Sequence, residues 1–266
     1  MKHHPILSVK ARTINFFVKN FNLTNYYRQM KKLHNTHLGE SCFVIGNGPS
    51  LTAEDLNTIA GNNIDSFAMN RIYKIFPQTD WRPTYYVNTD WVLIRDVLDT
   101  VNTIPAKQKF FPIHHLYNES FRKQIKNKYI FFLGCSDEMP YSIDCSECLK
   151  GVGTVTIASI QLAAHMGYRN IFLLGIDHNF DNIIDENGNT IINKGVRNYF
   201  VDDYDKDISN EVVHNLGNTT RRYNEVQEYF PKHGVNILNA TRVTKLEAFP
   251  KISFEEAISI ITSPKC

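Results

Sequence analysis

The residues best suited to chemistry in this chain form a run of small and polar residues, Gly46-Asn47-Gly48-Pro49-Ser50, directly after the apolar residues 42–45. Glycine permits a positive φ and a close approach of the backbone to a ligand, and a helix that starts after such a turn offers unpaired N–H groups to an anion. The spacing matches neither G-x-G-x-x-G nor a P-loop that ends in Gly-Lys-Ser/Thr. The run therefore indicates a phosphate or nucleotide turn, and a strand-to-helix turn without a ligand is the alternative.

Three further apolar runs end in polar or small residues, namely Asn70-Arg71, Asn88 and Gly175-Ile176-Asp177. In an open parallel sheet, ligands bind at the carboxyl ends of the strands. We therefore expect these side chains and Asn47 to face one crevice. An asparagine amide both donates and accepts hydrogen bonds, which suits a base, a ribose or a phosphate.

The elements that would position these residues alternate between strands and helices. The expected strands cover residues 41–45, 64–70, 83–88, 108–113, 129–133, 169–175 and 235–239. The expected helices include residues 119–126, 155–166, 218–230 and 253–262, with Ser50 or Thr52 as the cap of the helix that follows the first strand. This order predicts an α/β fold, a Rossmann-like and mostly parallel sheet with flanking helices.

Residues 178–217 differ from the rest, because their apolar periodicity weakens while acidic and aromatic residues accumulate. So long an irregular stretch inside a domain is typical of a lid or a binding loop. It contains a D-x-D pattern, Asp203-Tyr204-Asp205, which would suit Mg or Mn because paired carboxylates bind hard cations. We interpret the acids instead as a solvated loop and assign no metal ligand.

The first 38 residues form a basic segment, which we separate from a catalytic domain at residues 39–266. Seven Lys and Arg residues and no acid precede Gly39. Residues 5–35 are expected to be helical and amphipathic. Such a segment binds an anionic membrane surface, packs on the main domain or contacts a second copy, and the sequence leaves these alternatives open.

The five cysteines have no regular spacing, which argues against a disulfide framework. Cys145-x-x-Cys148 has no second pair and no histidine at zinc spacing, so we interpret the cysteines as free thiols of a reducing compartment. No apolar run approaches the roughly 18 residues of a membrane span. We therefore predict a cytoplasmic protein, and peripheral attachment to the inner face of the membrane stays open.

Several segments together resemble the bacterial sialyltransferases of the Campylobacter type. They also resemble the wider group that shares their nucleotide-binding core, which includes flagellin-modifying nonulosonate transferases and pterin pyrophosphokinase-like proteins. The matching segments are Val44-Ile45-Gly46-Asn47-Gly48-Pro49-Ser50-Leu51, Ala68-Met69-Asn70-Arg71, Tyr86-Val87-Asn88 and residues 154–177.

The resemblance implies a GT-A-like variant of the fold with a small lid, and a site for CMP. The implied nucleotide-binding residues are Gly46, Asn47, Gly48, Pro49, Ser50, Asn70, Arg71, Asn88, Thr154, Gly175, Asp177 and His178. It further implies a histidine base, for which His214 is our choice and His178 the reserve, and tyrosine hydroxyls on the leaving phosphate, which Tyr199 and Tyr204 would supply. The arginine that this family places just before Thr154 is absent, and Gly151-Val152-Gly153 stands there.

We accordingly predict an inverting glycosyltransferase that moves a sialic-acid-like sugar from a CMP-sugar to a glycan acceptor in bacterial surface polysaccharide or lipopolysaccharide synthesis. It would need no cofactor and no metal, and no nucleic-acid partner is expected. One alternative is a Mg-dependent pterin-type pyrophosphokinase. Another is a non-catalytic nucleotide-binding member of a glycan assembly complex. A homo-oligomer is compatible with each.

Overall fold

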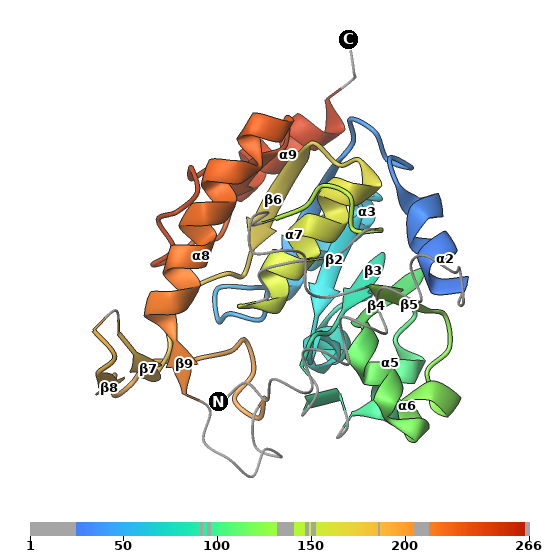
Figure 1. Ribbon diagram of the computed structural model, residues 1–266. Helices are drawn as coiled ribbons and strands as arrows, with labels where there is room; N and C mark the ends of the chain where they lie inside the picture. Colours follow the sequence, from blue (N-terminus) through green and yellow to red (C-terminus); the bar gives the residue numbers. More distant parts are fainter. Residues whose placement is uncertain are drawn as a thin grey trace.

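The computed structural model describes residues 25–90, 93–94, 97–131, 141–146, 149, 153–185, 187–204 and 213–263. At their centre lies a seven-stranded sheet with the strand order β10-β6-β1-β2-β3-β4-β5 (Figure 1). Its strands are β1 Ser41–Ile45, β2 Ser66–Met69, β3 Tyr85–Val87, β4 Gln108–Pro112, β5 Lys128–Phe131, β6 Asn170–Leu174 and β10 Asn236–Asn239. Every neighbouring pair is parallel, so the predicted Rossmann-like α/β fold is confirmed.

Strand β1 shows why the sheet strands are nearly continuous apolar runs. Cys42 and Val44 are buried in one hydrophobic cluster, whereas Phe43 and Ile45 are buried in a second cluster on the opposite face. Side chains alternate between the faces of a strand, and helices cover both faces of a parallel sheet. The residues of β1 from Cys42 to Ile45 are therefore buried, whichever face of the sheet each side chain takes.

The helices form two layers around the sheet. One cluster joins the sheet to α2, α7 and α8, and the other joins it to α3, α5, α6, α9 and the 3-10 helices η1 and η2. In Figure 1, α7 lies in front of the sheet and α3 behind it. The bounds are α2 Asn25–Leu33, α3 Ala53–Gly61, η1 Ile72–Gln78, α5 Leu98–Thr103, η2 Ile113–Tyr117, α6 Glu119–Gln124, α7 Val155–Met166, α8 Leu216–Tyr229, η3 Pro231–His233 and α9 Phe254–Thr262.

Two of the helix ends correspond to the predictions, and one does not. Thr52 caps α3 by accepting a hydrogen bond from the backbone of Asp55, and Gly167 ends α7 with a φ of +102°. Helix α8 starts earlier than predicted, because the Asn215 side chain accepts from the backbone N–H of Asn218. Asn218, at which the predicted helix begins, therefore lies in the first turn of α8.

The predicted lid contains a small sheet that the sequence analysis did not anticipate. It has the order β8-β7-β9, with β7 Asn182–Ile184, β8 Thr190–Ile192 and β9 His214–Asn215. In Figure 1 it lies beside the amino end of α8. These strands are two or three residues long, and β8 is exposed throughout, so no alternation of apolar residues marks them.

Helix α2 is the part of the basic N-terminal segment that the structure describes before the turn into β1. Met30 and Leu33 are buried in the cluster that contains α7, and Nε2 of His165 lies 2.8 Å from the carbonyl oxygen of Met30. Residues 25–33 thus pack on the main domain. Residues 5–24, where most of the predicted amphipathic helix falls, lie outside the described residues.

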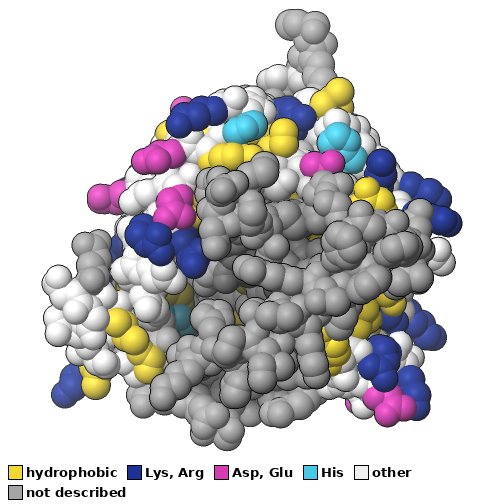
Figure 2. Space-filling model, in the orientation of Figure 1, with side chains coloured by type: hydrophobic (Ala, Val, Ile, Leu, Met, Phe, Trp, Pro, Cys, Tyr) yellow, Lys and Arg dark blue, Asp and Glu magenta, His cyan; other side chains and the backbone are white. Residues whose placement is uncertain are grey.

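Among the described helices, none has both the length and the apolar character needed to cross a bilayer. On the face shown in Figure 2, Lys and Arg side chains of the described residues are interspersed with Asp and Glu. Charges of both signs therefore share this surface. The prediction of peripheral membrane attachment depends on residues that the structure does not describe.

Candidate functional site

The topological switch point of the sheet lies between β1 and β6. From β1 the chain proceeds through β2 to β5 on one side, and β6 lies on the other side of β1. The carboxyl ends of such neighbouring strands are where open α/β sheets bind ligands. The turns at residues 46–50 and 175–178 begin there, and their glycines and polar residues form the floor of the candidate site.

The two turns touch through glycine. The backbone N–H of Gly48 donates to the carbonyl oxygen of Gly175 at 2.9 Å. A Cβ on Gly46 would lie 2.4 Å from the same oxygen, and a Cβ on Gly48 would lie 2.0 Å from Oδ1 of Asp177. A side chain at either position would separate the strands, so this contact explains why the motif contains two glycines.

Asp177 holds the first turn in place. Its Oδ2 accepts from the backbone N–H of Ser50 at 3.0 Å, and its Oδ1 accepts from the Ser50 hydroxyl at 2.6 Å. Burial raises the pKa of the Asp177 carboxyl, and the two hydrogen bonds from Ser50 oppose this shift. Pro49 lies next to this contact and is half-buried. The carboxylate thus turns toward the protein and shapes the wall of the crevice.

The three asparagines at the strand ends come together as the sequence predicts. Nδ2 of Asn47 donates to the carbonyl oxygen of Met69 at 3.2 Å, and Nδ2 of Asn88 donates to Oδ1 of Asn70 at 3.3 Å. Oδ1 of Asn47 and Oδ1 of Asn88 are buried and have no hydrogen-bond partner among the described residues. A buried acceptor without a donor is costly, so a ligand with hydroxyl or amino groups suits this place.

The amino end of α7 forms another wall. The Thr154 side chain caps the helix, and the hydroxyl of Thr156 lies 3.6 Å from Sδ of Met69, the last residue of β2. Helix α7 therefore starts beside the asparagines. Twelve residues of helix behind this end direct a partial positive charge toward the crevice, where it favours an anion.

Arg222 is a candidate that the sequence analysis missed. It lies on α8, and its Cδ is 2.4 Å from the position that a Cβ on Gly153 would occupy. Its Nε is buried and has no partner among the described residues. An arginine therefore does lie beside the start of α7, although it comes from a distant part of the chain. The glycine at position 153 is the signal in the sequence, because a Cβ there would force the Arg222 side chain to shift.

Lid residues also contact these strand ends. The backbone N–H of Phe200 donates to the carbonyl oxygen of Asn47 at 3.1 Å. The hydroxyl of Tyr204 accepts from the backbone N–H of Arg71 at 3.2 Å, and Nη1 of Arg71 donates to the carbonyl oxygen of Tyr204 at 2.7 Å. The ring of Tyr199 stacks on Tyr204 with the centroids 3.8 Å apart. Both predicted tyrosines thus lie next to the end of β2.

His214 continues this aromatic layer. Its ring stacks on Phe180 at 3.7 Å between centroids and lies 6.5 Å from Tyr199. Burial lowers the pKa of His214 to about 4, and its Nε2 has no partner among the described residues. At neutral pH the imidazole is therefore uncharged and has a nitrogen available to accept a proton.

His178 lies on the β6 side of His214. Its Nε2 is 2.8 Å from Oγ1 of Thr220, and its φ is +53°. Burial and the neighbouring His214 lower its pKa to about 4. The residues predicted as catalytic, Tyr204, Tyr199 and His214, therefore lie one beside the next, and the reserve base His178 lies near His214. The partner at Thr220 makes His178 the more constrained of the two histidines.

Of the two carboxylates of the D-x-D pattern, that of Asp203 lies among the described residues. Tyr204, its middle residue, is buried against Arg71. Asp203 forms an ion pair with Lys74, with 3.4 Å between Nζ and Oδ2. Asp205 lies outside the described residues. The structure thus assigns Asp203 a partner on the surface of the main domain.

Comparisons with known proteins give one family and a distant structural likeness. The family described as "6-hydroxymethylpterin diphosphokinase MptE-like" matches residues 15–182. No curated protein matches the chain. The MAf glycosyltransferase from Magnetospirillum magneticum AMB-1 has a similar structure, with a TM-score of 0.54 and 14% sequence identity over 87% of this chain. At that identity the likeness shows a shared fold, and the match spans only 38% of that protein.

Proposed function

The chain belongs to the 6-hydroxymethylpterin diphosphokinase MptE-like family, and on this premise we propose that it is an inverting glycosyltransferase that uses a CMP-activated sugar. Membership in this family confirms the resemblance to the pterin pyrophosphokinase-like proteins. The Campylobacter-type sialyltransferase likeness remains a prediction. The name of the MAf structure supports glycosyl transfer as an activity that this fold can host.

The observation that carries the proposal is the pair of unpartnered amide oxygens after β1 and β3, the two strands that flank β2. Oδ1 of Asn47 and Oδ1 of Asn88 are both buried without a donor among the described residues. Their amide nitrogens already donate within the protein, so the oxygens are the groups left for a ligand. The ribose hydroxyls and the exocyclic amine of a cytidine are donors of the required kind.

The phosphate would occupy the space between the first turn and the start of α7. The N-terminal N–H groups of α7 and the guanidinium of Arg222 offer positive charge there. The turn at residues 46–50 contributes a backbone that can be approached closely because it contains two glycines. This arrangement holds a leaving phosphate through donors that are in place before reaction.

His214 would act as the base. It takes the proton of the acceptor hydroxyl, whose oxygen then bonds to the anomeric carbon while the bond to the CMP phosphate breaks with its electrons on the phosphate. A pKa of about 4 makes His214 a weak base in the free protein. The negative charge of a bound donor raises the pKa of a nearby imidazole, so the base gains strength when substrate arrives. Tyr199 would donate its hydroxyl to the departing phosphate.

A pterin-type diphosphokinase is the second candidate, and the family description favours it. It would bind ATP with Mg rather than a CMP-sugar. A non-catalytic nucleotide-binding role remains the third. Thermal-shift measurements against CMP, CDP, UDP, GDP and ATP with Mg distinguish the three proposals. Stabilisation by CMP or CDP supports the transferase, stabilisation by ATP with Mg supports the kinase, and stabilisation by none of them supports the third.

The asparagine oxygens have a matched control within the same sheet. Asn236 and Asn170 form a similar amide pair at the amino ends of the strands, with 3.1 Å between Nδ2 of Asn236 and Oδ1 of Asn170. We expect Asn88→Ala to remove the stabilisation by CMP and Asn236→Ala to retain it. Equal responses of the two variants would refute the assignment of the nucleotide to the carboxyl ends of β1, β2 and β3.

The base is tested by His214→Ala, which we expect to abolish transfer while CMP still binds, because the imidazole removes a proton and does not hold the nucleotide. His233→Ala is the matched control. His233 also stacks on an aromatic ring, that of Tyr229, but it is exposed and lies at the far end of α8. Transfer is measured from a CMP-sugar donor. Near-normal turnover by His214→Ala would eliminate His214 as the base.

A further inference from the structure

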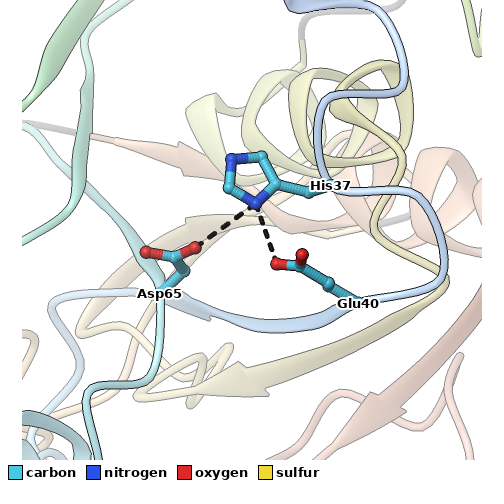
Figure 3. Close-up of side chains that lie close together, drawn as sticks. All are labelled: His37, Glu40 and Asp65. Carbon is cyan, nitrogen blue, oxygen red and sulfur yellow. Dashed lines mark hydrogen bonds and ion pairs between the residues drawn. The ribbon is translucent and has the colours of Figure 1, made fainter.

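A second cluster of reactive side chains lies at the amino edge of the sheet, away from the crevice. His37 and Glu40 belong to the turn between α2 and β1, and Asp65 precedes β2 (Figure 3). Among the described residues, no other group of three histidine, cysteine or acidic side chains has its ligand atoms within 4.8 Å of one another. The three residues come from two chain segments that fold side by side.

The ligand atoms have the spacing of a coordination sphere. Nδ1 of His37 lies 2.9 Å from Oε2 of Glu40 and 3.6 Å from Oδ2 of Asp65, and Figure 3 shows both carboxylates facing the same ring nitrogen. Two ligands at about 2.0–2.2 Å from one metal ion and about 90–110° apart are separated by roughly 2.9–3.6 Å. A cation therefore fits among these atoms with small side-chain shifts.

The His37 ring is held in the orientation that a metal ligand needs. It stacks on Tyr168 with 4.7 Å between centroids, and its Nε2 lies 2.9 Å from the hydroxyl of Tyr85. The hydroxyl of Tyr168 also donates to Oδ2 of Asp65 at 2.6 Å. Metal-binding histidines usually have a hydrogen-bond partner on the second nitrogen, and their carboxylate neighbours are oriented in the same way. Two tyrosines of the core provide this support.

The backbone of the ligand turn is also fixed. The N–H of His37 donates to the carbonyl oxygen of Met166 at 2.7 Å, and the N–H of Gly39 donates to that of Gly167 at 3.0 Å. A Cβ on Gly167 would lie 2.8 Å from the backbone nitrogen of Leu38, so the turn lies directly on the end of α7. The site would therefore be largely formed before an ion binds.

We propose that His37, Glu40 and Asp65 bind a borderline divalent cation of the Zn²⁺ class, independently of the nucleotide crevice. One imidazole nitrogen with two carboxylates suits such an ion, whereas Mg²⁺ and Ca²⁺ prefer oxygen ligands alone. The two carboxylates balance its charge. The side chains of His37, Glu40 and Asp65 are 21%, 46% and 20% exposed, so water completes the coordination. The ion would join the turn before β1 to the residue before β2.

The full chain, stripped of metal, is titrated with Zn²⁺ by calorimetry and with Co²⁺ by visible absorption. We expect one ion per chain in a site that His37→Gln, Glu40→Gln and Asp65→Asn each weaken by more than tenfold. Asp80→Asn, which removes the same charge from an exposed position, should bind as the wild type does. Binding should also weaken in acid, because protons compete for the histidine nitrogen.

Asn at position 65 can still accept from Tyr168, so Asp65→Asn retains the support of the turn and tests the ligand itself. Circular dichroism of each variant verifies that it is folded. Absence of Zn²⁺ binding by the wild type would overturn the proposal and leave the cluster as a histidine–carboxylate ion pair. The proposal is also overturned if the three variants bind Zn²⁺ as tightly as the wild type does.

Discussion

Replacing Gly48 with alanine places a methyl group against the side chain of Asp177, which holds the turn at residues 46–50. The new Cβ would lie 2.0 Å from Oδ1 of Asp177 and 2.8 Å from the carbonyl oxygen of Gly175. A Cβ essentially never approaches another atom to within 3.0 Å, so Asp177 must move by about 1 Å. The hydroxyl of Ser50 donates to that same oxygen at 2.6 Å, and a shift of this size leads to its loss.

The expected cost follows from these contacts. A hydrogen bond to a charged group contributes roughly 1.5–3 kcal/mol, and an extra methyl group in a packed site costs about 1–3 kcal/mol. Because Asp177 can relax in part, we expect Gly48→Ala to lower the free energy of unfolding by about 2–4 kcal/mol. The displaced turn should also weaken CMP binding at least tenfold, which corresponds to about 1.4 kcal/mol.

Urea denaturation measures the first effect and calorimetry with CMP the second. Gly61→Ala is the control, since nothing lies within 4 Å of its added Cβ at the end of α3, and it should be neutral or stabilise by up to about 1 kcal/mol. Asp177→Ala removes the clash with the carboxylate and leaves only the contact with the carbonyl oxygen of Gly175, so the two substitutions together should cost less than the sum of the single ones. A Gly48→Ala protein with wild-type stability and CMP affinity would refute the close contact between β1 and β6.

Two further predictions concern the stability of the fold in acid and the binding of the CMP phosphate. Burial lowers the pKa of His178 and of His214 from 6.5 to about 4, so the unfolded chain takes up protons that the fold excludes. The free energy of unfolding should therefore decrease as pH falls from about 6.5 to about 4, with a smaller slope in His214→Ala, and an unchanged slope would contradict the burial. Arg222→Ala should weaken CMP binding at least tenfold but leave cytidine binding unchanged, because the proposed role of the guanidinium is to bind the phosphate. The exposed Arg221, paired with Glu225 at 2.6 Å, is the control, and an equal loss for cytidine would contradict the assignment.

The central sheet was predictable because its signals are local. Each strand is an apolar run that ends in glycine or a polar residue, and helix α7 was predicted with its observed bounds, Val155–Met166, because Thr154 and Gly167 cap it. The small lid sheet was not predictable. Its strands are two or three residues long and pair with partners up to 31 residues away, as Ile183 with His214 does, and such pairing leaves no periodic pattern.

The candidate site also combines an arrangement that was predictable from the sequence with contacts that were not. Asn47, Asn70 and Asn88 were placed together from the sequence, because parallel strands bring their carboxyl ends to one edge. The contact of Arg222 with Gly153 and the stacking of Tyr199 on Tyr204 were not predicted from the sequence. Both depend on side-chain orientations that packing decides.

The sequence by itself therefore determined the α/β class, the edge of the sheet at which Asn47, Asn70 and Asn88 meet and the residue types there, since these follow from periodicity and from the geometry of parallel strands. Only the tertiary structure decided what each side chain does there. It turned Asp177 onto Ser50, left the amide oxygens of Asn47 and Asn88 without partners, and buried His214 as a neutral imidazole. These outcomes depend on which atoms remain unpaired after packing, and that is a property of the whole fold.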